Sequence, residues 1–379
     1  MLPDMRPLSV LGMVSYRVFP AQMGGQKCVV EFYRHLAKYT QVVLAVSKDN
    51  PANGEWGGQT FPILYHHNQG PANLLALLRL RKIVKTRQID LFCIEHSYLG
   101  WMGILLRWFS GKPFVIRSHN IEAHRFRDMQ KPWWLIYQWY EKQVHRQANH
   151  NFFITQEDKD WAVKQWGIAE ARCTVITYGT DISGPIGTDE KLQARIQILK
   201  ENRLHPSTRL FLFNGTLDYM PNTDALRIIV SELLPRLQQF SVPFCIFICG
   251  SRISRQWKDV LENTAGILYK GFVEDISFYL NGTDCFINPV TLGSGIKIKL
   301  ADALAHDLPC ISTRSGARGI DTAMTGYTLR LINDYDWQEF AKAMIVRADN
   351  TPPPMPESFY QFFNWDLIVQ KALLSLHTV

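Results

Sequence analysis

The sequence contains no apolar run long enough to cross a lipid bilayer. The longest one, YLGWMGILLRWF from Tyr98, is well short of the roughly 20 residues that a membrane-spanning helix needs. The N-terminal segment holds Pro3, Asp4 and Pro7 ahead of a short apolar stretch, which fits a first strand better than a secretory signal. We therefore predict that the protein is not integral to a membrane.

Paired cysteines and clusters of metal ligands are missing as well. The seven cysteines are scattered through mostly apolar runs without a CxxC pair, which is typical of buried, reduced thiols in a cytoplasmic protein. His66 and His67 are adjacent but have no Asp, Glu or Cys at ligand spacing, so we assign them to the end of a strand. The sequence thus predicts no metal site.

The chain lacks dense basic runs and aromatic–basic repeats, although it is basic overall. It has 41 Lys and Arg against 34 Asp and Glu, which gives a formal net charge of +7. This mild excess favours nucleotides, phosphates or an acidic membrane surface as partners, and it argues against nucleic acid. With 46% hydrophobic residues, the chain can form ordinary globular cores.

Short apolar runs alternate with segments of helical periodicity, which is the pattern of parallel strands joined by crossover helices. The runs include LSVLGMVSY, QVVLAVS, DLFCIEH and PFVIRSH, followed later by RLFLFNG, VPFCIFICG, DCFINPV and LPCISTR. The stretch TDISGPIG between the two series is the best linker candidate. We predict an α/β fold with two doubly wound, Rossmann-like domains, and a proline cluster from Thr351 that precedes a last helix.

Four motifs follow predicted strands, where ligands of doubly wound domains usually bind. MGGQ around Gly24 follows the first strand, and SHNIE around His119 follows PFVIR. NGT around Gly215 follows RLFLF, and GSG around Gly293 follows CFINPV. The sequence therefore predicts a ligand cleft lined by these four segments.

The segment GSGIKIKLADAL has the composition of an anion site. If a helix begins near Ser294, then Gly295, Lys299 and Asp302 fall at i, i+4 and i+7 and share one face. Bare glycine backbone and a helix N-terminus suit a phosphate, Lys299 can neutralise a diphosphate, and Asp302 can accept hydrogen bonds from ribose hydroxyls. The alternative is an exposed pair of side chains on a solvated helix.

The run GSGIKIKLADALAHDLPCIST resembles the signature of retaining GT-B glycosyltransferases, the large family that includes sucrose synthases and phosphatidylinositol mannosyltransferases. GGQKCVVEFYRHLAKY, VIRSHNIEAHRF, VITYGTD, FNGTLDYMPNTDAL and FFNWDLIVQKAL resemble further segments of that family in the same order. The resemblance implies an acceptor domain over residues 1–180, a linker region over 181–207, a nucleotide-sugar domain over 208–355 and a helix over 356–379 that packs back on the first domain. It implies a UDP- or GDP-sugar as donor and no further cofactor.

The resemblance also implies functional residues. His119 is expected to contact the donor sugar near the acceptor, and Lys299 is expected to hold the diphosphate. The expected donor-binding residues are Gly215, Thr216, Val273, Gly293, Ser294, Gly295, Ile296, Lys297 and Asp302, and those of the acceptor or diphosphate loop are Gly24, Gly25, Asn120 and Glu122. Structural roles are the alternatives: turns for the glycines, a cap for His119 and a helix start for Glu122.

The chain departs from the family pattern in two places. Many members have one glutamate before the glycine turn and a second eight residues on, but here Thr291, Leu292 and Ser294 occupy the earlier region. Many members also have an arginine and a lysine where this chain has GTLDYMPNTD, without a cation. The diphosphate then depends on Lys297 or Lys299, and the face shared with Asp302 favours Lys299.

The segment KPWWLIYQWYEKQVHR from Lys131 is rich in aromatic residues with flanking cations. Trp133, Trp134 and Trp139 suit the headgroup boundary of an acidic bilayer. Alternatively, Trp134, Tyr137 and Tyr140 pack a helix onto its own domain. The sequence therefore predicts a cytoplasmic protein, with peripheral binding to a membrane through the Trp133/Trp134 region as one of two interpretations.

The function expected from these observations is transfer of a sugar from a nucleotide-sugar donor to a hydroxyl acceptor, with retention of the anomeric configuration. The acceptor would be a glycan, a lipid-linked saccharide or a polysaccharide precursor. Two rivals remain. The missing first acid allows a catalytically silent GT-B scaffold subunit of polysaccharide assembly, and a sugar-nucleotide epimerase can share the architecture but would be expected to place acids in the cleft.

Overall fold

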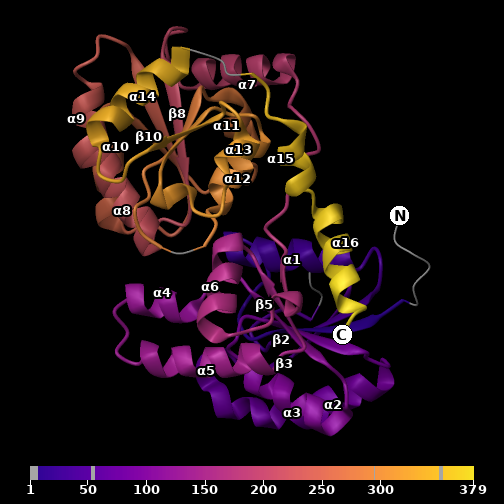
Figure 1. Ribbon diagram of the computed structural model, residues 1–379. Coiled ribbons are helices and arrows are strands. Elements are labelled where there is room, and N and C mark those ends of the chain that lie inside the picture. Colours follow the sequence, from indigo (N-terminus) through magenta and orange to yellow (C-terminus); the bar gives the residue numbers. More distant parts are fainter. Residues whose placement is uncertain (1–6, 53–55, 294, 350–352) are drawn as a thin grey trace. The chain divides into compact units, whose positions relative to one another are not determined.

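The chain forms two compact units that differ in their strand number. The computed structural model describes residues 7–52, 56–293, 295–349 and 353–379. The first unit comprises residues 1–179 and 362–379, and the second comprises residues 180–361 (Figure 1). Each unit has one parallel sheet covered by helices, so the predicted α/β fold with two doubly wound domains is confirmed. Within the described ranges, no helix has both the length and the apolar character needed to span a membrane.

The first unit contains a seven-stranded sheet with the order β3-β2-β1-β4-β5-β6-β7. Its strands are β1 (Ser9–Val14), β2 (Gln41–Ser47), β3 (Gln59–Leu64), β4 (Leu91–Glu95), β5 (Phe114–Ser118), β6 (His150–Phe153) and β7 (Cys173–Val175). β1 pairs in parallel with β2 on one side and with β4 on the other, so the order of the strands reverses between β1 and β4. Every residue of β1, β4 and β5 is buried, as expected for central strands with helices on both faces.

Helices cover both faces of this sheet. They are α1 (Gly24–Leu36), η1 (His67–Ala76), α2 (Leu77–Thr86), α3 (Gly100–Ser110), α4 (Glu122–Asp128), α5 (Trp134–Gln147), α6 (Gln156–Trp166), η2 (Glu170–Arg172) and α16 (Trp365–Leu376). One core cluster joins α2, α3 and α5 to the strands through buried residues such as Leu80, Met102 and Val144. The layer α2, α3 and α5 therefore shares a single apolar core with the sheet.

The C-terminal helix α16 belongs to the first unit, as expected for the fold. Its N-cap is Asn364, whose side-chain oxygen accepts a hydrogen bond from the backbone N–H of Leu367 at 3.0 Å. α16 packs against α1, and His35 Nδ1 lies 2.9 Å from Asp366 Oδ1 between the two helices. Trp365 is buried at this contact. The predicted return of the last helix to the first domain is confirmed.

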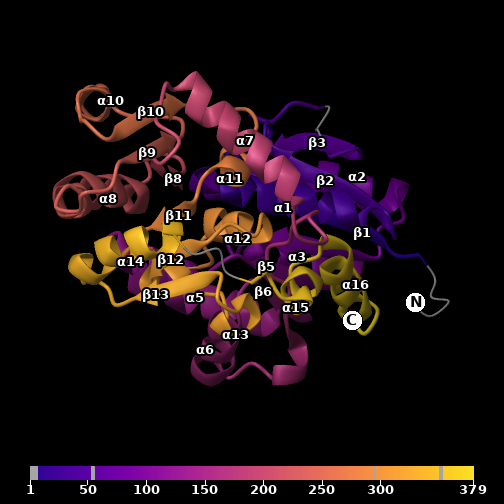
Figure 2. The same cartoon turned by 90° about the horizontal axis from the view of Figure 1, so that it is seen from above.

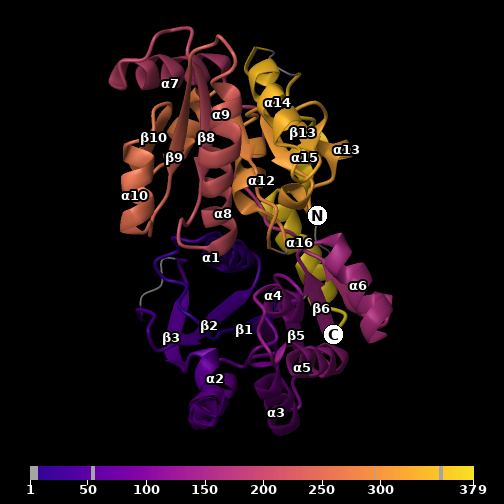
Figure 3. The same ribbon diagram turned by 90° about the vertical axis from the view of Figure 1, so that its left-hand side faces the viewer.

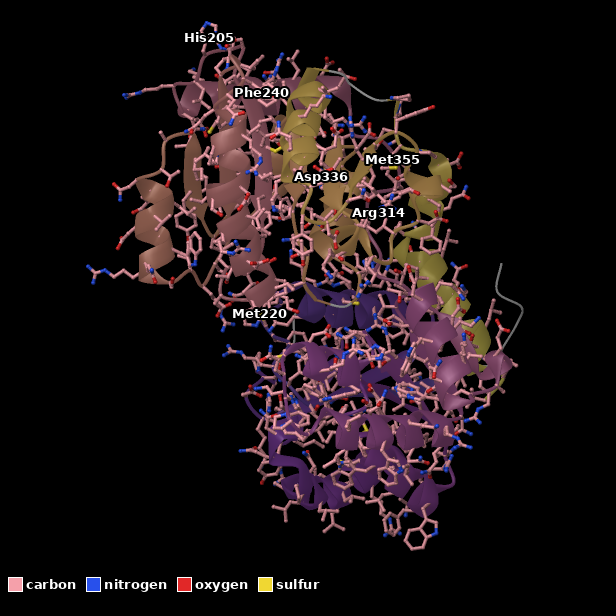
Figure 4. All side chains as sticks on the ribbon, turned by 60° about the vertical axis from the view of Figure 1, so that its left-hand side comes forward. His205, Met220, Phe240, Arg314, Asp336 and Met355 are labelled. Atoms are coloured by element: carbon pink, nitrogen blue, oxygen red, sulfur yellow. The ribbon has the colours of Figure 1, made fainter. Side chains whose placement is uncertain are left out.

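The second unit contains a six-stranded sheet with the order β10-β9-β8-β11-β12-β13, which Figure 2 shows in this sequence. Its strands are β8 (Arg209–Asn214), β9 (Phe244–Cys249), β10 (Ile267–Gly271), β11 (Cys285–Asn288), β12 (Cys310–Thr313) and β13 (Leu329–Ile332). The reversal lies between β8 and β11. In Figure 4, His205 and Phe240 lie toward the end where β8 and β9 begin, and Met220 lies toward the carboxyl edge.

One helix of the second unit, α7, lies within the predicted linker region 181–207. The helices of this unit are α7 (Thr188–Glu201), α8 (Met220–Ile228), η3 (Ile229–Leu233), α9 (Leu234–Leu237), α10 (Arg255–Glu262), α11 (Ser277–Gly282), α12 (Ile298–Ala305), η4 (Ser315–Ala317), α13 (Thr322–Thr325), α14 (Trp337–Asp349) and α15 (Glu357–Phe362). α7 packs against α11 and buries Ala194 and Ile198, spaced four residues apart. Residues 188–201 are thus part of the second unit.

All seven cysteines lie in described segments, are buried and have free thiols, as predicted. They occur mostly on central strands, where a small apolar side chain fits between sheet and helix. Burial raises the pKa of the Cys93 thiol to about 12. These thiols are therefore uncharged packing groups.

Candidate functional site

The glycine motifs of the second unit follow two neighbouring strands. The segment with Gly215 follows β8, and the segment with Gly293 follows β11, which pairs with β8. Both motifs therefore lie at the carboxyl edge of the sheet, on either side of the reversal in strand order. This is the usual ligand position in open α/β sheets.

Two left-handed glycines decide where the next helix begins. Gly293 has φ 87° and Gly295 has φ 73°, a backbone region that only glycine adopts without cost. A right-handed helix cannot include them, so α12 begins at Ile298 with Lys297 as its N-cap. The predicted helix start near Ser294 is wrong, and Gly295 lies before the helix. Ser294 itself lies outside the described residues.

Lys297 and Lys299 have different surroundings. Lys297 Nζ donates hydrogen bonds to the backbone oxygens of Gly293 at 2.8 Å and Gly295 at 3.0 Å, so it closes the glycine turn. Lys299 Nζ instead donates to Asn222 Oδ1 at 2.7 Å and lies 3.9 Å from the centre of the Phe213 ring. Burial, reinforced by the charge of Lys297, lowers the pKa of Lys299 well below its ordinary value. A bound anion would therefore stabilise the charged form of Lys299.

Asn222 links Lys299 to the predicted donor residues Gly215 and Thr216. It lies in the first turn of α8, and its Nδ2 donates to the backbone oxygen of Thr216 at 2.9 Å. A Cβ at position 215 would lie 2.7 Å from this Nδ2, so the close approach requires glycine there. Our sequence analysis missed Asn222, although its place in the first turn of a helix after a strand was visible.

The remaining donor candidates are distributed along the same edge. Asp302 is partly buried in α12, at i+3 from Lys299, so the two side chains share a helix face. Ile296 lies partly buried between the glycine turn and α12. Val273 follows β10, the edge strand, which is two strands away from β8. Val273 is therefore not brought to the reversal with the others.

Histidines gather at the carboxyl edge of the sheet in the first unit. His66 and His67 follow β3, as expected for a strand end, and His96 and His119 follow β4 and β5. The ring centroids of His96 and His119 are 4.3 Å apart, and the His67 ring stacks on Tyr98 at 4.2 Å. The topology thus brings together rings from three strand ends.

His119 is held by a fully buried ion pair. Its Nε2 lies 2.7 Å from Glu95 Oε2, which also pairs with Arg117 Nη1 at 3.0 Å. Burial opposes the charge on Glu95, but Arg117 and the hydrogen bond with His119 outweigh it and lower the pKa of Glu95 to about 2. Burial, assisted by His96, lowers the pKa of His119 to about 4. The neutral ring donates from Nε2 to Glu95 and keeps Nδ1 as a hydrogen-bond acceptor.

Glu122 lies beside His96, a residue that our sequence analysis missed. Glu122 begins α4, and its carboxylate lies 3.0 Å from His96 Nδ1, 2.5 Å from Tyr98 Oη and 2.7 Å from Arg125 Nε. His96 has φ 59°, a left-handed conformation that is rare outside glycine and concentrates at functional sites. In the sequence, His96 could be recognised only by its position directly after β4, one of the two strands between which the strand order reverses.

Several buried polar atoms near this reversal lack a hydrogen-bond partner in the described part of the chain. They include Ser15 Oγ, Tyr16 Oη, His67 Nδ1 and Asn120 Oδ1, together with Glu95 Oε1, His96 Nδ1 and Arg117 Nε. Ser15 and Tyr16 directly follow β1, and the Tyr16 ring lies 5.7 Å from the His96 ring. Buried polar atoms are rarely left unpaired in native proteins. This edge is therefore suited to a ligand rich in hydroxyl groups.

Gly24 and Gly25 open helix α1 at the same edge. Gly25 is exposed, and no atom lies within 4 Å of the place where a Cβ would be. The first turn of α1 contains no acidic residue. The N-terminus of this 13-residue helix can therefore approach an anionic group closely.

Glu141 binds the backbone at the N-terminus of α4. It is fully buried on α5 and accepts hydrogen bonds from the backbone N–H groups of Glu122 and Ala123, both at 3.0 Å, and from Ser97 Oγ at 3.1 Å. Burial raises the pKa of Glu141 to about 8, and the nearby charge of Glu122 acts in the same direction. The carboxyl group therefore binds a proton at a higher pH than an ordinary glutamate does.

Glu141→Gln should flatten the pH dependence of stability. Because the folded pKa lies above the ordinary 4.5, this carboxyl group stabilises the fold below pH 4.5, and that contribution is lost as the pH rises through 8. Between pH 4.5 and 8, this titration should lower the free energy of unfolding by about 1.4 kcal/mol for each unit by which the pH rises. Urea denaturation of both proteins across the window measures the two slopes, and equal slopes would contradict the raised pKa.

Comparison with known proteins identifies similar sequences and folds. The sequence profile of Glycosyltransferase Family 4 matches residues 23–183, and that of Glycosyl transferases group 1 matches residues 208–350. UDP-Gal:alpha-D-GlcNAc-diphosphoundecaprenol alpha-1,3-galactosyltransferase from Escherichia coli is 23% identical over 294 residues, which are 73% of this chain and 71% of that protein.

Solved structures with the same fold cover the whole chain. Sucrose-phosphate synthase from Thermosynechococcus elongatus is similar with a TM-score of 0.73 and 14% identity, over 98% of both chains. Anabaena HepE in complex with UDP is similar with a TM-score of 0.72 and 15% identity, over 98% of this chain and 100% of that one. The similarity thus extends over both units.

Proposed function

The chain belongs to the GT-B glycosyltransferases, with a Glycosyltransferase Family 4 domain followed by a Glycosyl transferases group 1 domain, and we propose that it is a retaining hexosyltransferase. The proposed donor is a UDP-sugar, and the proposed acceptor is a hydroxyl group of a lipid-linked saccharide. The names of the E. coli relative and of the HepE complex support the nucleotide, and the relative supports the type of acceptor. The position of Lys299 in the first turn of α12, paired with Asn222 directly after the glycine turn, is the observation that carries the proposal.

The donor diphosphate is proposed to bind at the reversal of the second sheet. Left-handed glycines at 293 and 295 leave this turn without side chains that would block a ligand, and Lys299 supplies a cation that Asn222 already positions. As the bond between the sugar C1 and the phosphate oxygen breaks, negative charge grows on the leaving nucleoside diphosphate, and Lys299 stabilises it. Asp302 is proposed to accept hydrogen bonds from the ribose hydroxyls.

Retention is proposed to occur without a covalent sugar–enzyme intermediate. The acceptor oxygen attacks C1 on the face from which the diphosphate departs, and its proton passes to the departing phosphate oxygen. This route needs positioning and leaving-group stabilisation and no protein nucleophile. It agrees with the ion pairs that already engage the carboxylates of Glu95 and Glu122 with Arg117 and Arg125.

The acceptor is proposed to bind at the carboxyl edge of the first sheet. His119 Nδ1 can accept a hydrogen bond from a sugar hydroxyl without titration, because its pKa of about 4 leaves the ring neutral. The unpartnered Tyr16 Oη and Asn120 Oδ1 supply further polar contacts at this edge. A lipid-linked acceptor would place the enzyme at a membrane, and we propose a peripheral position on its cytoplasmic face.

A panel of UDP- and GDP-sugars, offered with a diphosphate-linked N-acetylglucosaminyl lipid, tests the proposal. We expect release of UDP and a new disaccharide whose anomeric configuration, read by NMR coupling constants, equals that of the donor. Nucleotide binding without any turnover would favour the silent scaffold subunit instead. Formation of an epimeric nucleotide sugar without an acceptor would favour the epimerase, and an inverted product would refute retention.

A further inference from the structure

Three helices of the first unit form one continuous layer. α3 packs against both α2 and α5, and Figures 1 and 3 show the three helices close together on one side of this unit. Their inner faces share the core with the sheet through Leu80, Met102 and Val144. We call the outer side of these helices, with the preceding η1, the α2–α3–α5 surface.

The α2–α3–α5 surface is positively charged. The ranges 67–86, 100–110 and 134–147 contain a single acidic residue, Glu141, and that residue is fully buried. The same ranges contain the cations Arg79, Arg81, Lys82, Lys85, Arg107, Lys142 and Arg146. All four cations of α2 are exposed. The surface therefore attracts negative charge without an internal counter-charge.

Large apolar side chains accompany these cations. Leu78 on α2 is 79% exposed, Trp108 on α3 is 79% exposed and Ile136 on α5 is 73% exposed. Leu74, Leu75, Phe109, Leu135 and Trp139 on the same elements are exposed as well. Each of these helices therefore carries apolar groups on its outer side in addition to its buried face, which an ordinary solvated surface does not do.

A hollow at one end of this surface brings two of these cations together with one more, Arg172. It is lined by Arg107, Arg146 and Arg172, where the C-termini of α3 and α5 come together. Arg107 Nη1 donates to the backbone oxygen of Gln147 at 2.6 Å and Arg172 Nη2 to that of Arg146 at 2.9 Å, so both guanidinium groups are held in place. Their remaining N–H groups can bind phosphate oxygens.

We infer that the α2–α3–α5 surface docks on an acidic lipid bilayer. Exposed leucines and tryptophans insert among the headgroups, while the surrounding Lys and Arg pair with anionic phosphates. The inference rests on the proposed function in one respect, because a lipid-linked acceptor explains why the protein would bind a membrane. The exposed side chains of this surface lie outside the proposed donor and acceptor sites. Its charge complementarity favours an acidic bilayer over a second copy, since this surface would face its own cations in a symmetric dimer.

The structure extends the predicted membrane contact beyond Trp133 and Trp134. Trp133 is 42% exposed although its ring lies 4.5 Å from the Phe126 ring, and Trp134 is partly buried. Tyr137 and Tyr140 face inward, as the packing interpretation predicted, and Tyr140 Oη donates to the backbone oxygen of Ser97 at 2.9 Å. On α5, the exposed apolar residues are Leu135, Ile136 and Trp139. The exposed residues of α2 form a further part of the proposed membrane contact, which our sequence analysis did not single out.

Vesicle flotation of the full-length protein tests the inference. We expect binding to phosphatidylcholine–phosphatidylglycerol vesicles, little binding to phosphatidylcholine alone, and weaker binding at high salt. Leu78→Glu with Ile136→Glu, and separately Arg79→Glu with Lys82→Glu, should each weaken binding by about tenfold or more. Transfer to a short-chain, water-soluble acceptor should remain unchanged in these variants, so a failure of docking is distinguishable from a failure of the proposed transfer.

Matched variants elsewhere on the chain provide the controls. Leu367→Glu with Leu374→Glu changes two leucines of α16 that are each 48% exposed, and Arg255→Glu with Lys342→Glu makes the same change in net charge on the second unit. Both controls should bind vesicles like the unaltered protein. The inference is overturned if the controls lose as much binding as the test variants, or if Leu78→Glu with Ile136→Glu dissociates a dimer and leaves vesicle binding intact.

Discussion

Replacing Lys299 by alanine should lower the rate of sugar transfer by about a hundredfold or more. The reason is electrostatic: the leaving diphosphate gains charge in the transition state, and Lys299 Nζ is already positioned by Asn222 Oδ1 at 2.7 Å to meet it. Stability should change by only about 1 kcal/mol, because the variant loses one hydrogen bond to a neutral amide. Steady-state kinetics, UDP affinity and the thermal midpoint together separate these effects.

Two control variants distinguish Lys299 from its neighbours. Asp302→Ala should weaken UDP binding and leave the rate at saturating donor nearly unchanged, since ribose hydroxyls do not change charge during transfer. Lys297→Ala should act less than Lys299→Ala, because Lys297 Nζ is engaged with the backbone oxygens of Gly293 and Gly295. If Lys299→Ala keeps near-normal turnover and Lys297→Ala does not, the diphosphate is held by Lys297 and our assignment is wrong.

Replacing Glu95 by glutamine should destabilise the first unit by about 3–5 kcal/mol and also impair transfer. Glu95 and Arg117 are both fully buried, so the variant leaves the Arg117 guanidinium without its counter-charge. The same change removes the carboxylate that holds His119 Nε2 at 2.7 Å, and with it the preference for Nδ1 as the acceptor. Chemical denaturation measures the first effect, and kinetics with saturating donor and varied acceptor measure the second.

The pH dependence of Glu95→Gln provides an independent check. In the unaltered protein the pKa of Glu95 is about 2, below the ordinary 4.5, so its contribution to stability is complete above pH 4.5 and is lost as the pH falls toward 2. The variant should lack this part of the acid destabilisation. A second change, Arg117→Met, should restore stability to Glu95→Gln without restoring transfer. Recovery of both properties would show that Glu95 serves the fold alone.

The sequence predicted the fold well because periodicity and burial are local signals. The eight apolar runs named above contain the strands β1, β2, β4, β5, β8, β9, β11 and β12, and the motifs around Gly24, His119, Gly215 and Gly293 follow strands as predicted. The resembling segment VITYGTD, in contrast, follows β7 and shares only Val175 with it. The start of α12 was predicted too early, because the conformation of Gly293 and Gly295 could not be known from their identity alone. A glycine permits a left-handed turn but also permits a helix.

The missed residues are those whose importance depends on distant partners. Asn222 and Lys299 are 77 positions apart in the chain, and Glu95 and His119 are 24 apart. Only the parallel order of β8 beside β11, and of β4 beside β5, brings these side chains together. His96 gave a weak signal for the same reason: a lone histidine after a strand has no visible partner until Glu122 and His119 are placed beside it.

The return of α16 to the first unit determines the order in which the two units can be completed during synthesis. Residues 180–361 of the second unit form one uninterrupted segment, whereas the first unit consists of two segments that flank it. Trp365, Ile368 and Val369 can fill the core of the first unit only after residues 180–361 have been synthesised. The unit that begins the chain is therefore the last to be finished, and until then α1 keeps the apolar side that α16 later covers exposed to chaperones and proteases.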